Sequence, residues 1–186
     1  DEMLSSARQL MEKGEFEAAA RIYQHFARRY TDHAALPEAE FDAALALKLA
    51  PGGSRDAVRS LREESVGAFK KFAADHPGNP KRARAECLMG MLYFELGDYK
   101  NAISLLREPA RQVDDPDAVL PILRTLASAY RMDGNYADAE SAYLQAAALP
   151  RNYSVDADYY ELGDMYRKRI ETAPGPAEKR AFEQKA

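Results

Sequence analysis

A six-residue pattern, Gly-x-aromatic-x-x-Ala, occurs three times in the chain and constrains its fold more than any other feature. Two copies, residues 97–102 and 134–139, begin 37 residues apart, and a third occupies residues 14–19. Sequence self-similarity at a period of about 20–50 residues is typical of chains that stack one supersecondary unit on the next. The pattern therefore predicts an array of similar units.

Helical periodicity surrounds each copy of the pattern, and the composition favours helices because Ala is abundant, Trp is absent, and Gly and Pro number only 10 each. The helices are expected to pair as hairpins, each with a first and a second helix. A small residue lies in the middle of the first helix of each hairpin, at steps of 37, 46, 37 and 36 residues: Ala7, Ala44, Gly90, Ala127 and Gly163. We predict an all-α fold of alternating helices, which span residues 3–13, 16–30, 37–49, 54–75, 80–95, 98–112, 117–132, 135–149, 155–170 and a stretch from 176 onward.

The pattern also predicts how the helices of a pair meet. Each glycine is expected to close a helix in the left-handed conformation, and the aromatic residue then plugs the corner before the next helix. Small residues on paired helices, such as Ala127 and Ala139, are expected to face each other and to let the helix axes approach to about 8–10 Å. We therefore expect Gly97→Val or Ala139→Asp to destabilise the fold severely.

The step of 46 residues marks a departure from the repeat. The loop at residues 51–54 precedes a second helix that is about nine residues longer than its counterparts. We expect the added turns to project beyond the neighbouring helices as a solvated extension, and a ridge or flap near residues 51–66 that regulates ligand access is the alternative. The charged residues of the extension are Arg55, Asp56, Arg59, Arg62, Glu63 and Glu64.

Charge and hydropathy exclude several function classes. With 26 Lys and Arg against 30 Asp and Glu, the net charge is −4, which argues against a nucleic-acid partner. The mean hydropathy of −0.53 and the absence of a long apolar run argue against a membrane span within these residues.

Neither a catalytic motif nor a cofactor motif is present. The single cysteine, Cys87, permits no internal disulfide and is expected to be a small inert apolar residue. His25, His33 and His76 have no metal-ligand spacing and are expected at the surface, so we predict no metal site. Phosphate-binding glycine loops and nucleophile elbows are absent from the sequence, so we predict no cofactor and no enzymatic activity.

Several positions resemble the signature of the tetratricopeptide repeat (TPR) family, and the resemblance covers nearly the whole chain. Residues 89–106 and 126–146 match two repeats well, residues 10–26 match a first repeat with a weaker opening helix, and residues 159–166 begin a last one. The matching residues of the two good repeats are Met89, Gly90, Tyr93, Gly97, Tyr99, Ala102 and Leu106, then Leu126, Ala127, Tyr130, Gly134, Tyr136, Ala139, Tyr143 and Ala146.

Two junctions between repeats are similar to those of bacterial cell-envelope members of this family, the outer-membrane-protein assembly lipoproteins and the Tol-Pal-associated periplasmic coordinators. The junctions join residues 26–30 to 37–40 and residues 72–77 to 82–86. This resemblance implies the bacterial periplasm or cell envelope, with the cytoplasm as the alternative. Since the chain opens on Asp1 without an initiator Met, we expect a processed form or a part of a longer chain.

The resemblance implies a right-handed superhelix, or α-solenoid, of about four and a half helical hairpins, whose first helices line a concave groove for segments of other proteins. The inward positions of these helices are our candidates for the groove: Arg8, Phe41, Leu45, Cys87, Met91, Phe94, Arg124, Ser128, Arg131, Tyr160, Asp164 and Arg167. We expect an apolar anchor of the ligand near Phe41, Leu45, Met91 and Phe94, and an acidic group near Arg124, Arg131 or Arg167. Ordinary packing or a solvated face is the alternative for each residue.

We predict a single TPR-like domain over residues 1–186. Its repeats are expected at residues 1–34, 37–77 with the lengthened second helix, 80–114, 117–150 and, in part, 154–186. The predicted function is a non-enzymatic protein–protein interaction module, a scaffold or assembly factor that binds a peptide or helix of its partner. The first alternative is a structural module that forms homo-oligomers through its open repeat ends, and an enzyme is the second.

Overall fold

The structure is a computed structural model of the 186-residue chain and describes residues 2–112, 115–149, 156–173 and 175–185. The described residues form α-helices joined by turns, without strands, so the predicted all-α fold is confirmed. Contacts divide the chain into two compact units, Asp1–Leu105 (unit 1) and Leu106–Ala186 (unit 2). The single domain predicted from the sequence stays a prediction.

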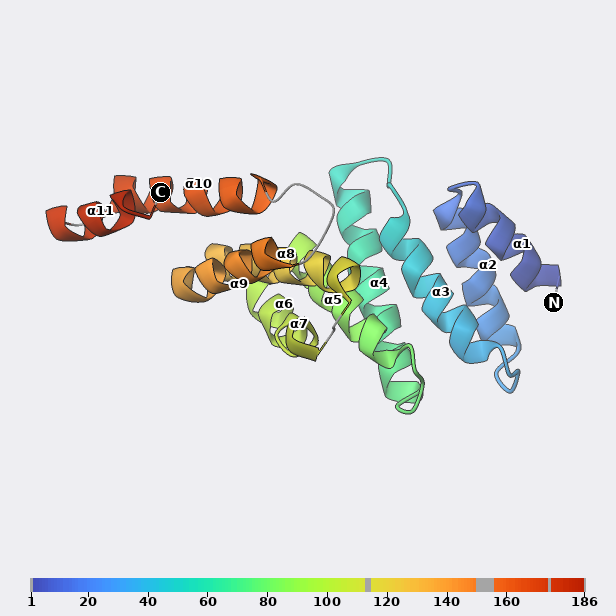
Figure 1. The fold of residues 1–186 in the computed structure, drawn as a ribbon. Helices are drawn as coiled ribbons and strands as arrows, with labels where there is room; N and C mark the ends of the chain where they lie inside the picture. Colours follow the sequence, from blue (N-terminus) through green and yellow to red (C-terminus); the bar gives the residue numbers. More distant parts are fainter. Residues whose placement is uncertain (1, 113–114, 150–155, 174, 186) are drawn as a thin grey trace. The chain divides into compact units, whose positions relative to one another are not determined.

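Most successive helices pack as neighbours within each unit (Figure 1). Unit 1 contains α1 (Glu2–Glu12), α2 (Phe16–Arg29), α3 (Leu36–Leu49), α4 (Arg55–Asp75), α5 (Arg82–Glu95) and nearly all of α6 (Tyr99–Leu106). Unit 2 contains α7 (Pro109–Gln112), α8 (Pro116–Met132), α9 (Tyr136–Ala148), α10 (Asp156–Thr172) and α11 (Pro176–Glu183). Most predicted helices agree with these bounds to within two residues.

One predicted helix, over residues 98–112, is wrong because the chain leaves the helical path after Leu106. The helix divides into α6 and the single turn α7, which begins at Pro109. Proline has no N–H to donate to the carbonyl of Leu105, and its ring would clash with that carbonyl in a continuous helix. The break follows from a proline that the helical periodicity did not take into account.

The three glycine turns have one geometry, which confirms the prediction for them. Gly14, Gly97 and Gly134 have φ of 76°, 84° and 82°, the left-handed region that glycine adopts without a steric penalty. The amide after each glycine donates to a carbonyl five residues before it, as in a Schellman motif. These bonds are Glu15 N to Leu10 O at 2.9 Å, Asp98 N to Tyr93 O at 2.8 Å and Asn135 N to Tyr130 O at 2.9 Å.

Alanines lie where paired helices cross, as predicted. Ala7 and Ala19 of the first pair are both fully buried, and so are Ala127 and Ala139 of a later pair. Without side-chain bulk at the crossing, larger residues beside it can close the core. In unit 1 that core forms two clusters, one around Tyr23 and Phe26 and the other around Phe41, Phe69 and Phe72.

The lengthened second helix is α4, with 21 residues against 14 in α2 and 13 in α9. Its added turns are fixed to the helices beside them. The Arg62 guanidinium donates to the carbonyl oxygens of Leu47 and Ala50, at 3.2 and 3.1 Å, and pairs with Glu95 at 2.8 Å. One turn later, the buried Ser65 hydroxyl donates to the Ala44 carbonyl at 2.7 Å. The prediction that Arg62 is solvated is therefore wrong.

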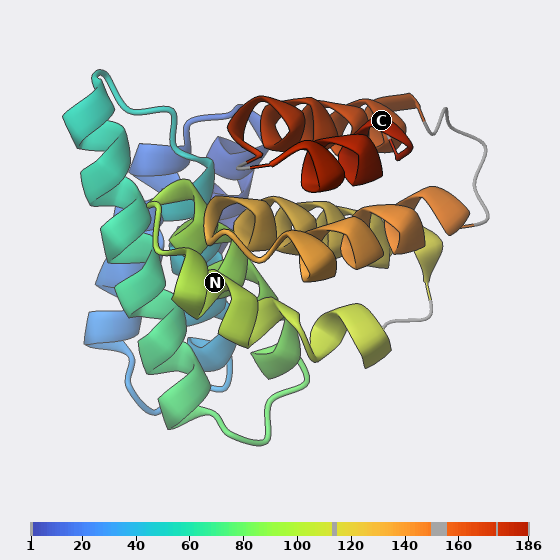
Figure 2. The same ribbon diagram turned by 90° about the vertical axis from the view of Figure 1, so that its left-hand side faces the viewer.

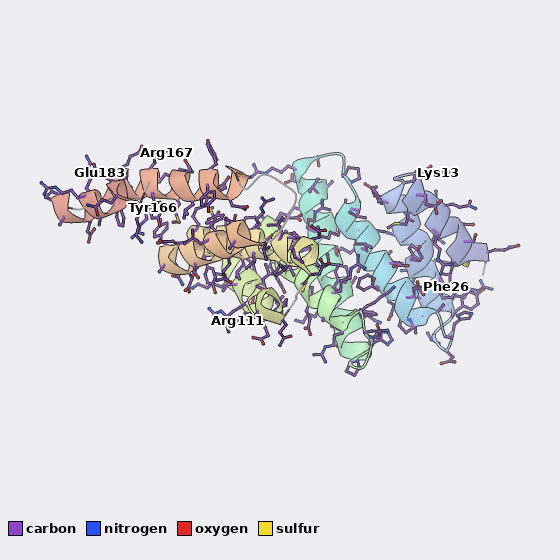
Figure 3. The ribbon with its side chains drawn as sticks, in the orientation of Figure 1. Lys13, Phe26, Arg111, Tyr166, Arg167 and Glu183 are labelled. Atoms are coloured by element: carbon purple, nitrogen blue, oxygen red, sulfur yellow. The ribbon has the colours of Figure 1, made fainter. Side chains whose placement is uncertain are left out.

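In unit 2 the α8–α9 pair and the α10–α11 pair lie one beside the other, in contact through α9 and α10 (Figure 2). Tyr166 and Arg167 project from opposite sides of α10 (Figure 3). The Tyr166 ring is buried. Burial is the main cause of the raised pKa of its hydroxyl, and the hydrogen bond to Glu140 raises that pKa further. Lys185 pairs with the same Glu140 at 2.9 Å, which ties the chain after α11 to α9.

Candidate functional site

Half-buried Asp42 lies at the centre of a charged cluster on the first helices of unit 1. Its carboxyl group, on α3, interacts electrostatically with Lys81 and Arg84 at the start of α5, with Glu38, and with Arg8 on α1. Burial raises the pKa of Asp42, and the three cations offset that effect only in part. Charged side chains from three successive first helices therefore act on one carboxyl group, and we call the surface around it the first-helix face of unit 1.

Leu45, Cys87 and Met91 supply this face with half-buried apolar side chains. Leu45 packs against the Phe41 cluster of the core and is still partly accessible. Burial, reinforced by the charge of Glu86, raises the pKa of the Cys87 thiol, so the thiol stays protonated at neutral pH. Leu45 and Met91 are thus the apolar candidates of unit 1 that a partner could cover.

Phe41 is not available as an anchor, so its prediction as a groove residue is wrong. Its side chain is 1% exposed and packs edge-on against Phe69 and Phe72 of α4, at ring-centroid distances of 5.4 and 5.5 Å. Lys81 and Arg84 lie over the same ring, at 5.0 and 5.7 Å. The turn of α3 directs this side chain towards α4, and the two cations cover what remains.

Phe94 is also separated from the other apolar candidates. Its ring lies 5.9 Å from the Tyr99 ring, and together they line a cavity next to the first turns of α4. Phe94 therefore belongs to a second surface of unit 1, formed with α4.

The arginine candidates of unit 2 already have acidic partners within the chain. The Arg124 guanidinium donates two hydrogen bonds to Asp158 of α10, at 2.6 and 3.0 Å, and the Asp158 side chain is 2% exposed. Arg131 pairs with Glu161 at 3.5 Å and with Asp164 at 3.7 Å. The prediction that these arginines bind an acidic group of a ligand does not fit this arrangement, because acidic side chains of α10 already pair with them.

The remaining candidates of unit 2 form a polar and partly exposed surface on α8 and α10. The Ser128 hydroxyl lies 3.2 Å from the Tyr143 hydroxyl. Arg167 pairs with Asp164 at 3.7 Å and lies over the Tyr160 ring, which is among the most exposed aromatic rings of the described residues. A hydrogen bond from Lys168 lowers the pKa of Asp164, so that carboxylate is charged at neutral pH.

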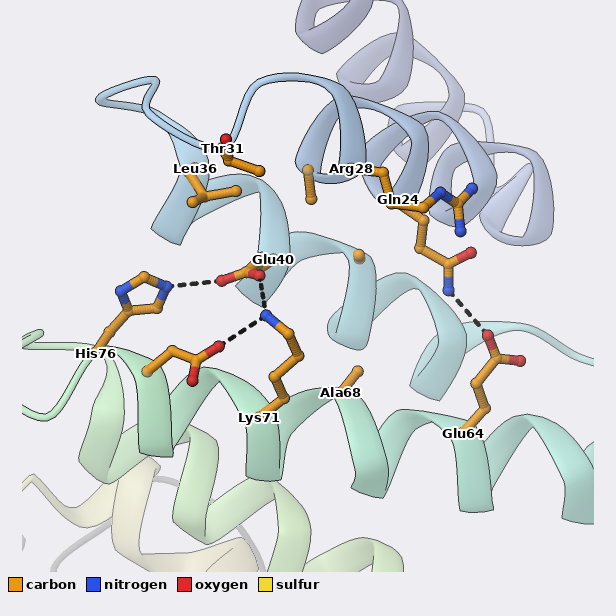
Figure 4. A pocket seen from close by; sticks show the side chains of 12 residues that line it. Gln24, Arg28, Thr31, Leu36, Glu40, Glu64, Ala68, Lys71 and His76 are labelled. Carbon is orange, nitrogen blue, oxygen red and sulfur yellow. Dashed lines mark hydrogen bonds and ion pairs between the residues drawn. The ribbon is translucent and has the colours of Figure 1, made fainter.

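A cavity of about 530 Å³, which was not predicted from the sequence, lies between α2 and α4, with α3 as its floor (Figure 4). Ala27, Ala43 and Ala68 face it from the three helices, and Leu36 closes one end. Three small residues on neighbouring helices leave a hollow that larger side chains would fill. Alanines outside the helix crossings were the available signal.

Charged side chains around this cavity are largely paired with one another. Glu40, which is 14% exposed, accepts from Lys71 at 2.5 Å and contacts His76 at 2.6 Å, and Lys71 also donates to Asp75 (Figure 4). At the other end, Gln24 donates to Glu64 at 2.9 Å. His76 is therefore half-buried, contrary to its predicted place at the surface.

No three or more His, Cys, Asp or Glu side chains of the described residues are grouped so that they could hold a metal ion. Nor is any helix in the described ranges long and apolar enough to cross a membrane.

Comparisons with known proteins agree with this geometry. Residues 81–152 match the family model for the tetratricopeptide repeat. The chain is similar to the solved TPR-like repeats of a Podosopora anserina protein described as a kinesin light chain, with 16% identity and a TM-score of 0.68 over 98% of this chain and 93% of that one. A single-substitution variant of that protein gives 15% identity and a TM-score of 0.69, over 98% and 90% of the two chains. No curated protein matches the sequence.

At these identities the solved structures establish the fold, while the family model establishes the repeat in sequence. TPR repeats are typical of protein–protein interaction scaffolds and are typically non-catalytic. Residues 81–152 are therefore similar in sequence to the tetratricopeptide repeat, and the chain has a TPR-like helical fold.

Proposed function

We propose that the chain is a non-enzymatic scaffold that binds a peptide or helix of a partner protein on the first-helix face of unit 1. One observation carries this proposal: charges from α1, α3 and α5 converge around half-buried Asp42, so three successive repeats present one surface. A partner that lies across these helices can contact all three repeats at once.

The side chains of this face suggest what the partner supplies. Half-buried Leu45 and Met91 favour apolar side chains, because a partner that covers them removes the rest of their surface from water. Arg8 and Arg84 are exposed, and no ion pair to either is found among the described residues, so they favour an acidic group at the edge. A donor that reaches Asp42 would stabilise a carboxylate whose charge burial disfavours.

Capture of a partner from a native extract by crosslinking tests this function. The wild-type chain is compared with Met91→Glu/Arg84→Glu on the first helices and with a control, Arg28→Glu/Lys70→Glu, on α2 and α4. Circular dichroism and thermal melting establish that the three proteins are folded. We expect the wild type and the control to capture the same partner and the first-helix variant to lose it.

Two results would contradict the proposal. Equal capture by all three proteins would place binding elsewhere on the chain, and loss in the control alone would assign it to the cavity between α2 and α4. Self-association through the repeat ends remains the alternative function, and light scattering at several concentrations distinguishes it. The bacterial cell envelope is kept as the proposed location on the resemblance of the repeat junctions.

A further inference from the structure

We propose that the added turns of α4 form a second recognition site, which binds an acidic segment of a protein through a carboxylate next to an apolar side chain. The site is a cavity of about 610 Å³ in unit 1, within the size range of ligand pockets, about 300–1,000 Å³. On the α4 side its lining residues all belong to the first eight residues of the helix: Arg55, Asp56, Val58, Arg59 and Arg62. The inserted turns therefore create the cavity.

Arg62 gives the cavity a fixed wall. Its side chain is 16% exposed, and it joins α4 to the end of α3 through the Leu47 and Ala50 carbonyls and to α5 through Glu95. Lys48 pairs with the same Glu95 at 3.3 Å. The extension is thus held against the α5–α6 turn, so the cavity exists before a ligand binds.

The other two arginines of the cavity, Arg55 and Arg59, can form ion pairs with a ligand. Arg55 is exposed, and no acidic side chain among the described residues forms an ion pair with it. It also lies in the first turn of a helix, where a cation is unfavourable, so its position is not explained by helix stability. Among the described residues Arg59 pairs with Glu63 alone, at 2.9 Å, and both side chains are more than half exposed. An exposed pair of this kind contributes little, so Arg59 can turn to a ligand at small cost.

Apart from Glu95 and Gly97, the residues of the opposite wall are apolar or aromatic. Phe94, Leu96 and Tyr99 are half-buried there, and Val58 of α4 completes the apolar surface. Because arginines border these side chains directly, the cavity suits a carboxylate beside a leucine or an aromatic residue.

Charge favours a carboxylate over a phosphate. Arg62 is already paired with Glu95, and Asp56 adds a negative charge to the same lining, so the uncommitted positive charge is small. A single carboxylate matches that charge better than a doubly charged phosphate does.

The test uses the whole chain and a phage-displayed library of random 12-residue peptides. Enriched peptides are synthesised with a fluorophore, and their affinities are measured by fluorescence polarisation at low and high salt. We expect peptides with Asp or Glu next to Leu, Phe or Trp, and weaker binding at high salt. Arg55→Glu/Arg59→Glu should weaken binding at least tenfold, whereas Arg55→Lys/Arg59→Lys should weaken it less because the charge remains.

Two control variants locate the site. Arg28→Glu on α2 and Met91→Glu on the first-helix face should leave peptide affinity unchanged, and all variants are compared by thermal melting. The proposal is overturned if no peptide is enriched, if the enriched peptides lack acidic residues, or if Arg55→Glu/Arg59→Glu binds them as the wild type does. Loss of binding in Met91→Glu alone would also overturn it, without affecting the function proposed for the first-helix face.

Discussion

At the scale of the residue, single polar side chains fix the helices of each unit to their neighbours. Arg62 and Ser65 of α4 bond to backbone carbonyls of α3 and its C-terminal end, and Arg124 of α8 bonds to buried Asp158 of α10. The residues of a repeat signature specify the helix crossings and the turns, but they do not specify these side-chain hydrogen bonds. They hold neighbouring helices together within each unit.

Arg62→Met should destabilise unit 1 by about 2–3 kcal/mol. The substitution removes two hydrogen bonds to carbonyls at the end of α3 and a charged partner of Glu95, while much of the side-chain packing is retained. Urea denaturation gives the change in the free energy of unfolding. The matched control is Arg59→Met, whose ion pair is exposed and should contribute less than about 1 kcal/mol. An equal loss of unfolding free energy in the two variants would contradict a special stabilising role for the Arg62 contacts.

Asp42→Asn should become more favourable relative to the wild type as the pH rises. Burial raises the folded-state pKa of Asp42 above the unfolded value of about 3.9, so the folded wild type binds more protons in the interval between the two values. Its stability contribution is therefore lost as the pH rises through that interval, and the asparagine variant has no such loss. Urea denaturation from pH 3.5 to 7 measures the difference in free energy of unfolding. A difference that stays constant with pH would contradict the raised pKa.

At the scale of the element, helical periodicity and the glycine turns predicted most helix bounds. Their physical basis is local: a left-handed glycine ends a helix wherever it occurs, as at Gly97 and Gly134. The break before Pro109 was equally local, and the proline alone could have indicated it. The fixed position of the α4 extension could not be predicted, because it depends on Arg62 reaching Glu95 across 33 residues of sequence.

Gly52→Ala should destabilise the loop before α4, whereas Gly53→Ala should not. Gly52 has φ of 64°, and a Cβ there would lie 2.8 Å from Val58 Cγ2 and 2.9 Å from the Val58 amide nitrogen. The left-handed conformation alone costs about 1–2 kcal/mol for a residue with a Cβ. At Gly53 a Cβ meets no described atom within 4 Å. Thermal melting of the two variants tests the difference, and equal melting temperatures would contradict the tight packing of the loop on α4.

At the scale of the whole molecule, the sequence predicted the TPR-like fold but only part of the candidate site. Leu45 and Met91 are accessible on the first helices, whereas Phe41 turned to the core and Arg124 to Asp158. Projection onto an ideal helix gives the direction of a side chain but not the neighbour that covers it. Asp42 was missed for the same reason, since only its electrostatic interactions with charged residues of α1 and at the start of α5 give it a role.

The central claim is that the first helices of unit 1 bind the partner, and hydrogen–deuterium exchange with mass spectrometry tests it most directly. Exchange is measured for the wild-type chain alone and with an excess of the partner captured by crosslinking. The account predicts slower exchange in α3 and α5 on binding, with α2 and the C-terminal half of α4 unchanged. Protection confined to α2 and α4, with none in α3 or α5, would contradict it.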